Sequence, residues 1–484
     1  MEKTGSHKRE SGYIAYKNMR ISHWDKIAGN LNRWNWCNSY YHKRLQEVVK
    51  FMVPPGQRVI EIGCGTGDLL ASLEPSYGVG VDFSAQMLKK AKERHPGLFF
   101  IEADAHELEM GEKFDFVILS DVVNEFWDVQ SVFQKILPLI TPRSRIIINF
   151  YSRLWELPLG LVRKLGLAKP MLLQNWLTVE DITGLLSLAD CEVVSRREEI
   201  IWPMRTPVID FLLNRFFVKI WPFKIFAITH FIIAKPVAAA PDSRELPKVS
   251  VVIPARNESG NVEQIFKSIP RMGRETELIF IEGGSTDDTC QVIEKNIANN
   301  PHLPAKLLQQ TGQGKGDAVR LGFQHAQGDI LMIFDADLTV PPEDLPRFYD
   351  AIYRGKAEFV NGVRLVYPME KEAMRFLNLA GNKFFSLVFS WLLGQPIKDT
   401  LCGTKVLWKK DYERIAENRS YFGNFDPFGD FDLLFGAAKL NLKIVEVPVR
   451  YRERTYGTTN ISRWKHGWLL LRMVFFALRR IKFV

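Results

Sequence analysis

The stretch Gly328-Asp329-Ile330-Leu331-Met332-Ile333-Phe334-Asp335-Ala336-Asp337-Leu338 constrains the fold of this chain more than any other. So short an apolar run predicts a central strand of a parallel sheet, and such sheets place ligands at their strand ends. Because side chains alternate along a strand, Asp335 and Asp337 are expected on one side. The two carboxylates would repel unless a cation lies between them or one stays protonated, and Mg²⁺ or Mn²⁺ holding a substrate diphosphate is the natural cation. The alternative is a solvated loop after a strand.

The length of 484 residues allows several domains, and the net charge of +9 indicates an anionic partner. Nucleic acid, an anionic membrane and nucleotide substrates fit this charge, but no basic-aromatic module for nucleic acid is present. Five scattered cysteines without a Cys-x-x-Cys pair indicate a reducing, cytoplasmic setting. The polar N-terminus argues against a signal peptide, and no apolar run approaches the roughly 20 residues needed to span a bilayer.

A glycine-rich turn, Glu61-Ile62-Gly63-Cys64-Gly65-Thr66-Gly67, lies between an expected strand and an expected helix. Its glycines let the backbone approach a ligand closely. The next expected strand ends at Asp82, where an acid can hydrogen-bond a ribose diol. Further strands over 99–105, 114–121 and 145–150 alternate with helices, which predicts a doubly wound sheet. Residues 1–51 are expected to form helices that cover this turn.

Residues of about 20 to 236 resemble the class I S-adenosylmethionine-dependent methyltransferases, and residues 61–67 are similar to that family's first motif. The resemblance implies a Rossmann-like domain that binds S-adenosylmethionine. The cofactor-binding residues that it implies are Glu61, Gly63, Gly65, Gly67, Asp82, Asp104, Ala105 and Ser120. An NAD-binding domain and a degenerate, non-catalytic domain are the alternatives. The methyl acceptor stays open: Asn124 and Glu125 could face it, or could serve in helix capping and solvation.

A Pro/Ala-rich segment without periodicity over 236–247 marks a domain boundary, after an expected antiparallel strand over 226–235. We therefore expect one domain over residues 1–240 and a second over 248–484. In the second domain, a strand that begins at 249 and ends at Pro254, and a strand over 278–282, precede a glycine-rich basic loop over 312–318. The helices that follow these strands are expected to be capped by Asn257 or Ser259, and by Ser285 or Thr286.

The second half resembles the family 2 glycosyltransferases with the nucleotide-sugar-binding fold of the GT-A type, and most of all the polyprenyl-phosphate sugar synthases. The motifs that carry the resemblance are Gly362-Val363-Arg364, Asp399-Thr400-Leu401-Cys402-Gly403-Thr404-Lys405, Asp430-Phe431-Asp432-Leu433-Leu434, and Val445-Glu446-Val447-Pro448-Val449 followed by Arg454-Thr455-Tyr456-Gly457. The nucleotide-sugar-binding residues that it implies are Pro254, Arg256, Glu258, Glu282, Asp335, Ala336, Asp337, Arg364 and Arg454.

Within this set the resemblance implies a metal on Asp335 and Asp337, and catalytic roles for Asp337, Arg364 and Asp432. Asp432 is either a base or a carboxylate that shapes the site, and Asp399 either acts in the site or orients its loop. Solvated charge is the alternative for Arg364 and Arg454. The chain has Glu282-Gly283 where the family has two aspartates, and Asn460 where it often has lysine. These departures bear on the base preference and on binding of the acceptor phosphate.

The sequence thus predicts a bifunctional enzyme, a methyltransferase joined to a metal-dependent inverting glycosyltransferase. The second activity would move a hexose from a GDP- or UDP-sugar to a polyprenyl (dolichyl or undecaprenyl) phosphate in glycan or glycolipid synthesis. A lipid phosphate is already an anion, whereas a hydroxyl acceptor would require a base. The alternatives are a glycosyltransferase that uses a carbohydrate hydroxyl, and a membrane-surface scaffold with one inactive domain.

The C-terminal segment has apolar residues at helical spacing and basic residues every seven positions. They are Trp464, Trp468, Leu471, Phe475 and Leu478, and Lys465, Arg472 and Arg479. An apolar stripe beside a basic one predicts an interfacial helix on anionic lipid, so the protein is expected to be peripheral on the cytoplasmic face of a membrane. The alternative is a helix packed on its own domain with its basic side solvated.

Overall fold

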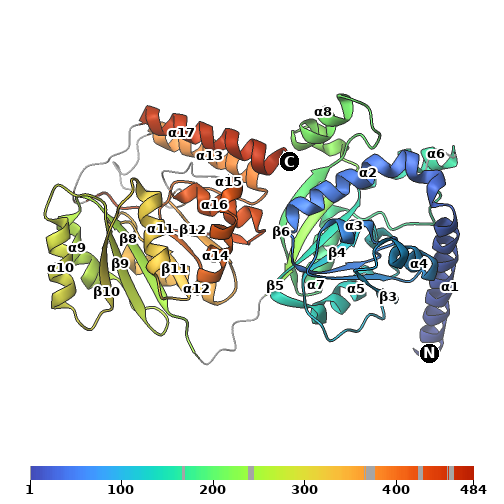
Figure 1. Cartoon of the computed structure of the whole chain (residues 1–484), viewed down its shortest axis with the longest axis horizontal. Helices are drawn as coiled ribbons and strands as arrows, with labels where there is room; N and C mark the ends of the chain where they lie inside the picture. Colours follow the sequence, from blue (N-terminus) through green and yellow to red (C-terminus); the bar gives the residue numbers. More distant parts are fainter. Residues whose placement is uncertain are drawn as a thin grey trace. The chain divides into compact units, whose positions relative to one another are not determined.

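The computed structural model of the chain describes residues 2–165, 169–237, 245–364, 366, 376–422, 429–454, 456 and 463–484. Within these ranges, the side chains of 2–10, 32–38, 376–380, 420, 422, 430 and 463–466 are not described. The chain divides into two compact units, Met1–Val237 with Phe483–Val484, and Ala238–Lys482. Each unit contains one seven-stranded sheet with helices on both faces (Figure 1). The predicted fold class, two doubly wound α/β domains, is confirmed.

The sheet of the first unit has the strand order β3-β2-β1-β4-β5-β7-β6. Its strands are β1 (Arg58–Ile62), β2 (Tyr77–Asp82), β3 (Phe99–Glu102), β4 (Phe114–Ser120), β5 (Ile140–Tyr151), β6 (Cys191–Glu199) and β7 (Thr229–Pro236). The first five are parallel, and β7 runs antiparallel to both β5 and β6. The antiparallel strand β7 was predicted, but the edge strand β6 was not. An edge strand is half solvated, and β6 is mainly polar and charged, so it lacks the apolar run that identifies a buried strand.

The helices of the first unit are α1 (Glu2–Gly29), α2 (Leu31–Met52), α3 (Asp68–Ser72), α4 (Ala85–Arg94), α5 (Val129–Ile136), α6 (Glu156–Lys164), α7 (Val179–Leu188) and α8 (Ile209–Arg215). Helices α5 and α7 pack on one face of the sheet, and α4 packs on the other through Leu88 and Ala91. Ser84 caps α4, since its hydroxyl accepts from the amide of Met87 at 3.2 Å. The helices expected over residues 1–51 are present as α1 and α2.

The sheet of the second unit has the order β10-β9-β8-β11-β13-β12-β14. Its strands are β8 (Val249–Ala255), β9 (Thr276–Glu282), β10 (Ala305–Gln309), β11 (Ile330–Ile333), β12 (Phe359–Val363), β13 (Lys405–Trp408) and β14 (Ile444–Pro448). Strand β13 is antiparallel to β11 and β12, and the other pairs are parallel. The parallel strands β8, β9 and β11 therefore direct their carboxyl ends to one edge of the sheet.

The helices of the second unit are α9 (Ser259–Ser268), α10 (Thr289–Asn299), α11 (Lys315–His325), α12 (Leu345–Tyr353), α13 (Phe376–Leu393), α14 (Lys409–Glu417), α15 (Arg419–Phe422), α16 (Asp430–Lys439) and α17 (Arg463–Ala477). One core lies between the sheet and α9, α10 and α12. A second core lies on the opposite face, under α11, α13, α14, α16 and α17. No helix in the part of the chain that the structure describes is both long and apolar enough to span a bilayer.

Two local predictions in the second unit are wrong. Strand β11 ends at Ile333, so Asp335 and Asp337 lie in the turn after the strand and not on it. The predicted caps also fail: Glu258 and Asp288 stand at the N-cap positions of α9 and α10, and neither side chain caps. Instead Asn257 and Ser285 bind each other's loops, because the amide of Asn257 donates to the Ser285 hydroxyl at 3.0 Å. The polar side chains that suit a cap thus join two neighbouring loops across the sheet edge.

Candidate active sites

The glycine turn of the first unit has the backbone that a close ligand contact requires. Gly63, Gly65 and Gly67 have φ of +76°, +51° and +73°, which favour glycine. A β-carbon at Gly63 would clash with Val122, whereas one at Gly65 would meet nothing within 4 Å. Open space beside Gly65, at the carboxyl end of a central strand, fits a bound cofactor.

Asp82 is fixed beside this turn by two backbone amides. Its carboxylate accepts from the amide of Gly65 at 2.8 Å and from that of Ser84 at 2.9 Å. Burial raises the pKa of Asp82 to about 6, although both hydrogen bonds oppose the shift. Each oxygen retains a further lone pair, so the predicted contact with a ribose diol is sterically and chemically available.

Glu61 acts inside the protein, below the turn. It is buried, and its carboxylate accepts from the amide of Leu70 in α3 at 3.0 Å. Burial raises the pKa of Glu61 to about 8. Glu61 therefore ties α3 to β1 across the glycine turn, inside the protein.

Asp104, Ala105 and Ser120 lie at the carboxyl ends of the neighbouring strands. Asp104 accepts from the ring Nδ1 of His106 at 2.7 Å and from its amide at 2.9 Å. Burial by itself would raise the pKa of Asp104. The contacts with His106 outweigh this effect and lower the pKa to about 2. Ala105 is buried in the core under α5, and Ser120 is the last residue of β4.

The residue after Ser120 was not predicted and is the most unusual polar group of this unit. Asp121 has a φ of +55°, in the left-handed region that few non-glycine residues adopt and that Asp tolerates better than most. Its Oδ1 accepts from the Tyr41 hydroxyl at 3.0 Å and from the Asn149 amide at 2.6 Å. Burial raises the pKa of Asp121 to about 7, while the charge of Lys169 opposes the shift. Its position directly after a strand end was the signal available in the sequence.

Asn124 and Glu125 are both buried, so the solvated alternative for them is wrong. The Asn124 side chain donates to the carbonyl of Asn175 at 2.6 Å. Glu125 accepts from the indole of Trp24 in α1 at 2.8 Å. These contacts bring α1 and the segment before α7 over the carboxyl end of β4, where a methyl acceptor would enter.

In the second unit, Asp335 and Asp337 each have a basic partner. Lys315 at the start of α11 lies 2.5 Å from Asp335, and Arg454 lies 2.6 Å from Asp337. Burial by itself would raise the pKa of Asp335, but the positive charge of Lys315 outweighs this effect and lowers the pKa. Lys315 belongs to the basic loop seen in the sequence, although no role was predicted for it. The repulsion expected between the two acids is thus relieved by cationic side chains.

The turn around these acids is closely packed. Thr339 donates its hydroxyl to Asp337 at 2.7 Å, and Ala336 is buried in the core. A β-carbon at Gly403 would clash with both Asp335 and Lys315. Gly403 therefore permits the segment between α13 and β13 to approach the acidic turn, which explains a glycine in that motif.

Two carboxylates in one turn suit Mg²⁺ or Mn²⁺ only if the substrate supplies further ligands. Among the described residues, no group of three or more His, Cys, Asp and Glu side chains gathers as a metal site. A nucleotide-sugar has a diphosphate that can provide the missing oxygens. The residues present fit a metal that is bound together with its substrate.

Arg454 connects the acidic turn to the predicted nucleotide pocket. Its guanidinium lies 2.6 Å from Asp337 and 3.6 Å from Glu258. Burial raises the pKa of Glu258 to about 7, and the charge of Arg454 opposes this. Nearby, the Tyr456 hydroxyl lies 3.0 Å from the Ser259 hydroxyl, and Gly260 leaves room for its ring. The loop after β14 therefore lies over the start of α9, while Thr455, Gly457 and Asn460 fall outside the described residues.

Arg364 makes a different contact from the predicted one. Its Nε and Nη2 donate to the two oxygens of Asp399 at 2.6 and 2.8 Å, and its amide donates at 3.1 Å. Asp399 is completely buried, and this pairing lowers its pKa to about 2 against the effect of burial. Solvated charge is therefore wrong for Arg364, and Asp399 orients its loop. The charge of Arg364 still reaches the acidic turn, where it helps to lower the pKa of Asp335.

Asp432 is buried and lies 2.9 Å from the guanidinium of Arg419, a partner that the sequence did not suggest.

Pro254 lies in β8, and Arg256 is exposed just after that strand. Glu282 ends β9 and accepts from the amide of Ser285 at 2.5 Å. A β-carbon at Gly283 would lie 3.3 Å from the Gln310 side-chain oxygen, so Gln310 stands where the family's second aspartate would point.

The two units define an α/β protein with a candidate ligand site at the carboxyl edge of each sheet. The family profile described as "Methyltransferase domain" matches residues 54–188, and that described as "Glycosyl transferase family 2" matches residues 250–416. The chain therefore joins a methyltransferase domain to a family 2 glycosyltransferase domain. The resemblance stated from the motifs is confirmed at this level.

Two curated relatives match part of this chain. An undecaprenyl-phosphate 4-deoxy-4-formamido-L-arabinose transferase from Klebsiella pneumoniae is 37% identical over 222 residues, which cover 44% of this chain and 63% of the relative. A dolichol-phosphate mannosyltransferase from Pyrococcus furiosus is 31% identical over 221 residues, 44% of this chain and 59% of the relative. The chain thus spans about three fifths of the length of these relatives.

Two solved structures are also similar, at low identity. An S-adenosylmethionine-dependent methyltransferase from Thermotoga maritima, a possible histamine N-methyltransferase, is 16% identical with a TM-score of 0.35, covering 44% of this chain and 98% of its own. Glucosyl-3-phosphoglycerate synthase from Mycobacterium tuberculosis, solved with Mn²⁺, UDP and glucosyl-3-phosphoglycerate, is 20% identical with a TM-score of 0.35, covering 49% and 80%.

Proposed function

We propose that the chain is a bifunctional enzyme: an S-adenosylmethionine-dependent methyltransferase and a metal-dependent glycosyltransferase that moves a hexose from a GDP- or UDP-sugar to a polyprenyl phosphate. The observation that best supports the second activity is the pair of acids in the turn after β11, each with a basic partner: Asp335 with Lys315, and Asp337 with Arg454. The curated relatives are named as transferases for undecaprenyl phosphate and dolichol phosphate, which supports a lipid phosphate as acceptor. The boundaries of the two catalytic domains are proposed as residues 1–240 and 248–484.

In glycosyl transfer, an acceptor phosphate oxygen forms a bond to the anomeric carbon as the bond to the donor diphosphate breaks. The nucleoside diphosphate leaves with its negative charge, and a metal on Asp335 and Asp337 would supply Lewis-acid neutralisation of that charge. Lys315 and Arg454 supply fixed positive charge at the same place. The attacking phosphate carries no proton, so Asp432, held by Arg419, shapes the site and does not act as a base.

In methyl transfer, the bond between sulfur and the methyl carbon breaks as the acceptor atom binds that carbon, so positioning dominates. S-adenosylmethionine supplies the activated methyl group. Asp82 and the glycine turn orient it, and Asp121, held by Tyr41 and Asn149, takes the proton from a hydroxyl or amine acceptor. A proton acceptor is most useful when its pKa is near the working pH, which is the case for Asp121.

The role of Asp121 predicts a pH dependence. Its raised pKa, about 7, means that the carboxylate form grows as pH rises through 7. Methyl transfer to an extract of lipids and glycans should therefore rise by up to about tenfold per pH unit below pH 7 and level off above it. Asp121→Asn should remove this rise and lower the plateau rate. A slope that persists in Asp121→Asn would assign the proton to another group.

Binding of the cofactor tests the first activity directly. Asp82→Asn should weaken binding of S-adenosylhomocysteine to the full-length protein by about 10- to 100-fold, because a charged hydrogen bond is lost. Asp68→Asn is the control, since Asp68 begins α3 directly after the turn and its carboxylate pairs with Arg94 and His95 at the surface. Calorimetry measures both. Tight binding of NADH with no response to S-adenosylhomocysteine would contradict the assignment.

Peripheral membrane contact is proposed for the second unit because α13 and α17 expose apolar side chains. Trp468, Leu471 and Phe475 of α17 are 67, 45 and 61% exposed, whereas Leu470, Met473 and Ala477 on its other side are buried. One face of the helix is thus packed on its own domain, and its other face exposes apolar side chains to solvent. This arrangement suits attachment at the cytoplasmic face of a membrane. Trp464 and Lys465 lie outside the described side chains.

A panel of labelled donors and acceptors tests the second activity. Full-length protein is incubated with GDP- and UDP-hexoses, Mn²⁺ or Mg²⁺, and either undecaprenyl phosphate or a free oligosaccharide. The expected product is a lipid-linked, phosphate-bound sugar that is sensitive to mild acid. Transfer only to the oligosaccharide would favour a hydroxyl acceptor, and transfer to neither acceptor in the presence of the right donor would contradict the proposal.

A further inference from the structure

Two segments of the first unit turn large apolar side chains outward. One is residues 153–165, which contain α6, and the other is the insertion 201–226 between β6 and β7, which contains α8. Fifteen of the thirty large hydrophobic side chains that are exposed in the described chain lie in these two segments. Leu157, Leu161 and Trp221 are 84, 61 and 74% exposed. We call the exposed apolar side chains of residues 153–165 and 201–226 the apolar patch.

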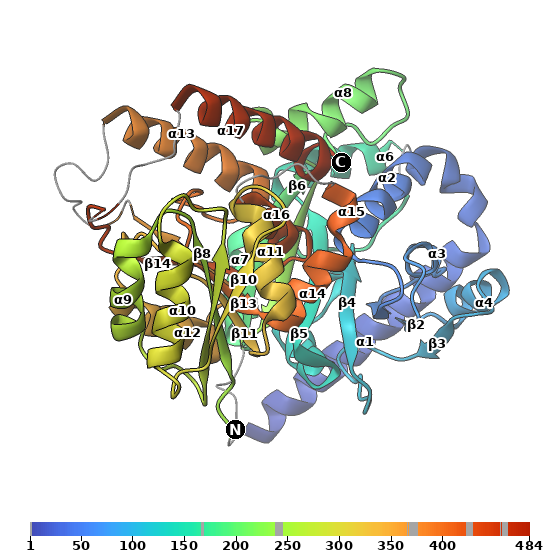
Figure 2. The same ribbon diagram turned by 60° about the vertical axis from the view of Figure 1, so that its left-hand side comes forward.

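The two segments belong to one surface. The indole of Trp155, just before α6, donates to the carbonyl of Phe226 at 3.1 Å. Within the insertion, the rings of Phe217 and Phe223 lie 5.0 Å apart. Helices α6 and α8 lie at the same end of the first unit in both views (Figures 1 and 2). Fifteen exposed large apolar side chains on two linked segments exceed the singly scattered ones that monomeric soluble proteins normally expose.

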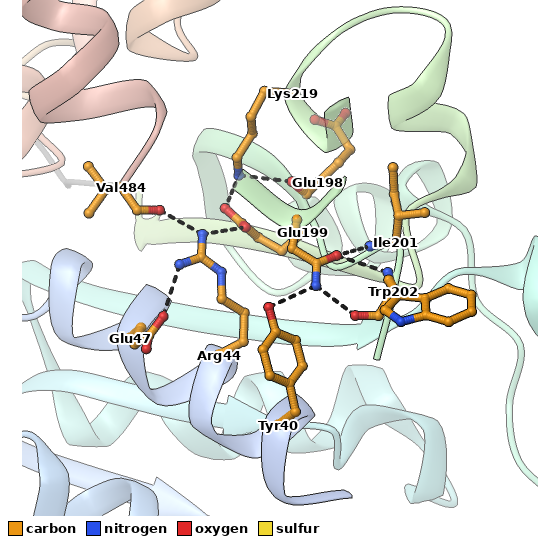
Figure 3. A network of polar contacts seen from close by, with 10 residues as sticks. Tyr40, Arg44, Glu47, Glu198, Glu199, Ile201, Trp202, Lys219 and Val484 are labelled. Carbon is orange, nitrogen blue, oxygen red and sulfur yellow. Dashed lines mark hydrogen bonds and ion pairs between the residues drawn. The ribbon is translucent and has the colours of Figure 1, made fainter. Parts of the chain in front are cut away.

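The buried side of the insertion carries two polar residues, Asn214 and Lys219, beside the apolar Val218. Asn214 of α8 is 1% exposed; its side chain accepts from the amides of Ile201 and Trp202, both at 2.8 Å. Lys219 is buried in an ion pair with Glu199 of β6 and donates to the carbonyl of Glu198 at 3.1 Å (Figure 3).

Helix α2 completes this buried network. Arg44 lies 3.4 Å from Glu199, and the amide of Asn214 donates to the Tyr40 hydroxyl at 3.0 Å (Figure 3). These buried polar contacts join the insertion to β6 and to α2. The insertion is therefore anchored by polar contacts, and its large apolar side chains face away from the protein core.

The charge around the patch is positive. Residues 153–165 and 201–226 contain seven basic and two acidic residues. Arg153, Lys164 and Arg205 are exposed, and Arg215 and Lys224 are partly exposed, between the apolar side chains. Basic residues that alternate with exposed Trp, Phe and Leu match a surface of anionic headgroups over hydrocarbon. An apolar protein interface does not require this charge.

We infer that the apolar patch is a lipid-bilayer contact surface of the methyltransferase unit. Its Leu, Phe and Trp side chains enter the headgroup region of an anionic membrane, and its basic side chains pair with lipid phosphates. This goes beyond the proposed function, in which only the second unit touches lipid. It does not depend on either proposed catalytic activity.

Vesicle flotation of the full-length protein tests the inference. Vesicles of phosphatidylcholine with 30% phosphatidylglycerol are compared with pure phosphatidylcholine, both in wild type and in a Trp468→Ser/Phe475→Ser background that weakens contact through α17. The combined change Leu157→Ser, Leu161→Ser, Trp221→Ser and Ile225→Ser should raise the lipid concentration for half-binding by about tenfold or more in both backgrounds. All four side chains are exposed, so folding should be kept.

Phe99→Ser with Leu188→Ser is the matched control, because these side chains are 57 and 65% exposed outside the patch. The control should bind vesicles like its parent. A second readout is quenching of tryptophan fluorescence by brominated lipid, which Trp221→Phe should reduce in a folded protein. Unchanged flotation of the fourfold variant would overturn the inference. So would a patch change that turns a dimer into a monomer in light scattering without altering vesicle binding, which would assign the patch to a second copy of the chain.

Discussion

Full-length protein with Asp337→Asn is expected to lose about 10³-fold of its glycosyl transfer rate, with methyl transfer unchanged. The substitution keeps the side-chain shape, and its amide oxygen can still accept from Thr339. It removes the negative charge that Arg454 contacts at 2.6 Å and that a metal would share with Asp335. The loss should therefore come from chemistry and donor binding, and not from unfolding.

The measurement is a paired assay in one tube, with labelled hexose and labelled methyl groups followed separately. A thermal shift with UDP or GDP, with and without Mn²⁺, gives a readout that does not depend on turnover, and the metal-induced shift should vanish. Asp344→Asn is the matched control, because Asp344 is an acid seven positions on that pairs with Arg347. Wild-type rates that persist in excess EDTA, or full activity of Asp337→Asn, would rule out this metal site.

The second large effect concerns stability. Arg364→Ala should destabilise the second unit by about 3–5 kcal/mol, because it leaves the fully buried Asp399 carboxylate without its charged partner. The pairing lowers the pKa of Asp399 to about 2, so the loss should be fully present at neutral pH and shrink only as pH falls below the pKa of an ordinary Asp and through about 2. Adding Asp399→Asn should restore part of the stability, since the unpaired charge is then absent.

Hydrogen exchange of peptides from the second unit, or pulse proteolysis in urea, measures this change without interference from the first unit. Arg354→Ala is the control, because Arg354 makes only an exposed helix pair with Asp350. If Arg364→Ala leaves stability intact but raises the KM for the nucleotide-sugar more than about tenfold, Arg364 contacts phosphate and the predicted catalytic role stands.

The sequence by itself identified the central parallel strands of the two sheets and the loops that carry the candidate sites, but it did not predict β10 and β13 of the second sheet. Apolar strands such as β1, β4 and β11 are buried on both faces, so their composition alone identifies them. The glycines at 63, 65 and 67 and the acids at 82, 335 and 337 follow directly from such strands, and local spacing therefore reveals them. Edge strand β6 escaped prediction because a strand in contact with water is not constrained to be apolar.

Only the tertiary structure decided which groups meet at the sites and which surface faces outward. Lys315 and Asp335, Arg454 and Asp337, and Arg364 and Asp399 are pairs joined by folding over long separations in the chain. Charge pairing depends on distance in space, which a local pattern does not encode. The same holds for the insertion 201–226: its sequence mixes apolar and basic residues, and only the buried network around Glu199 and Lys219 shows that its apolar side is the exposed one.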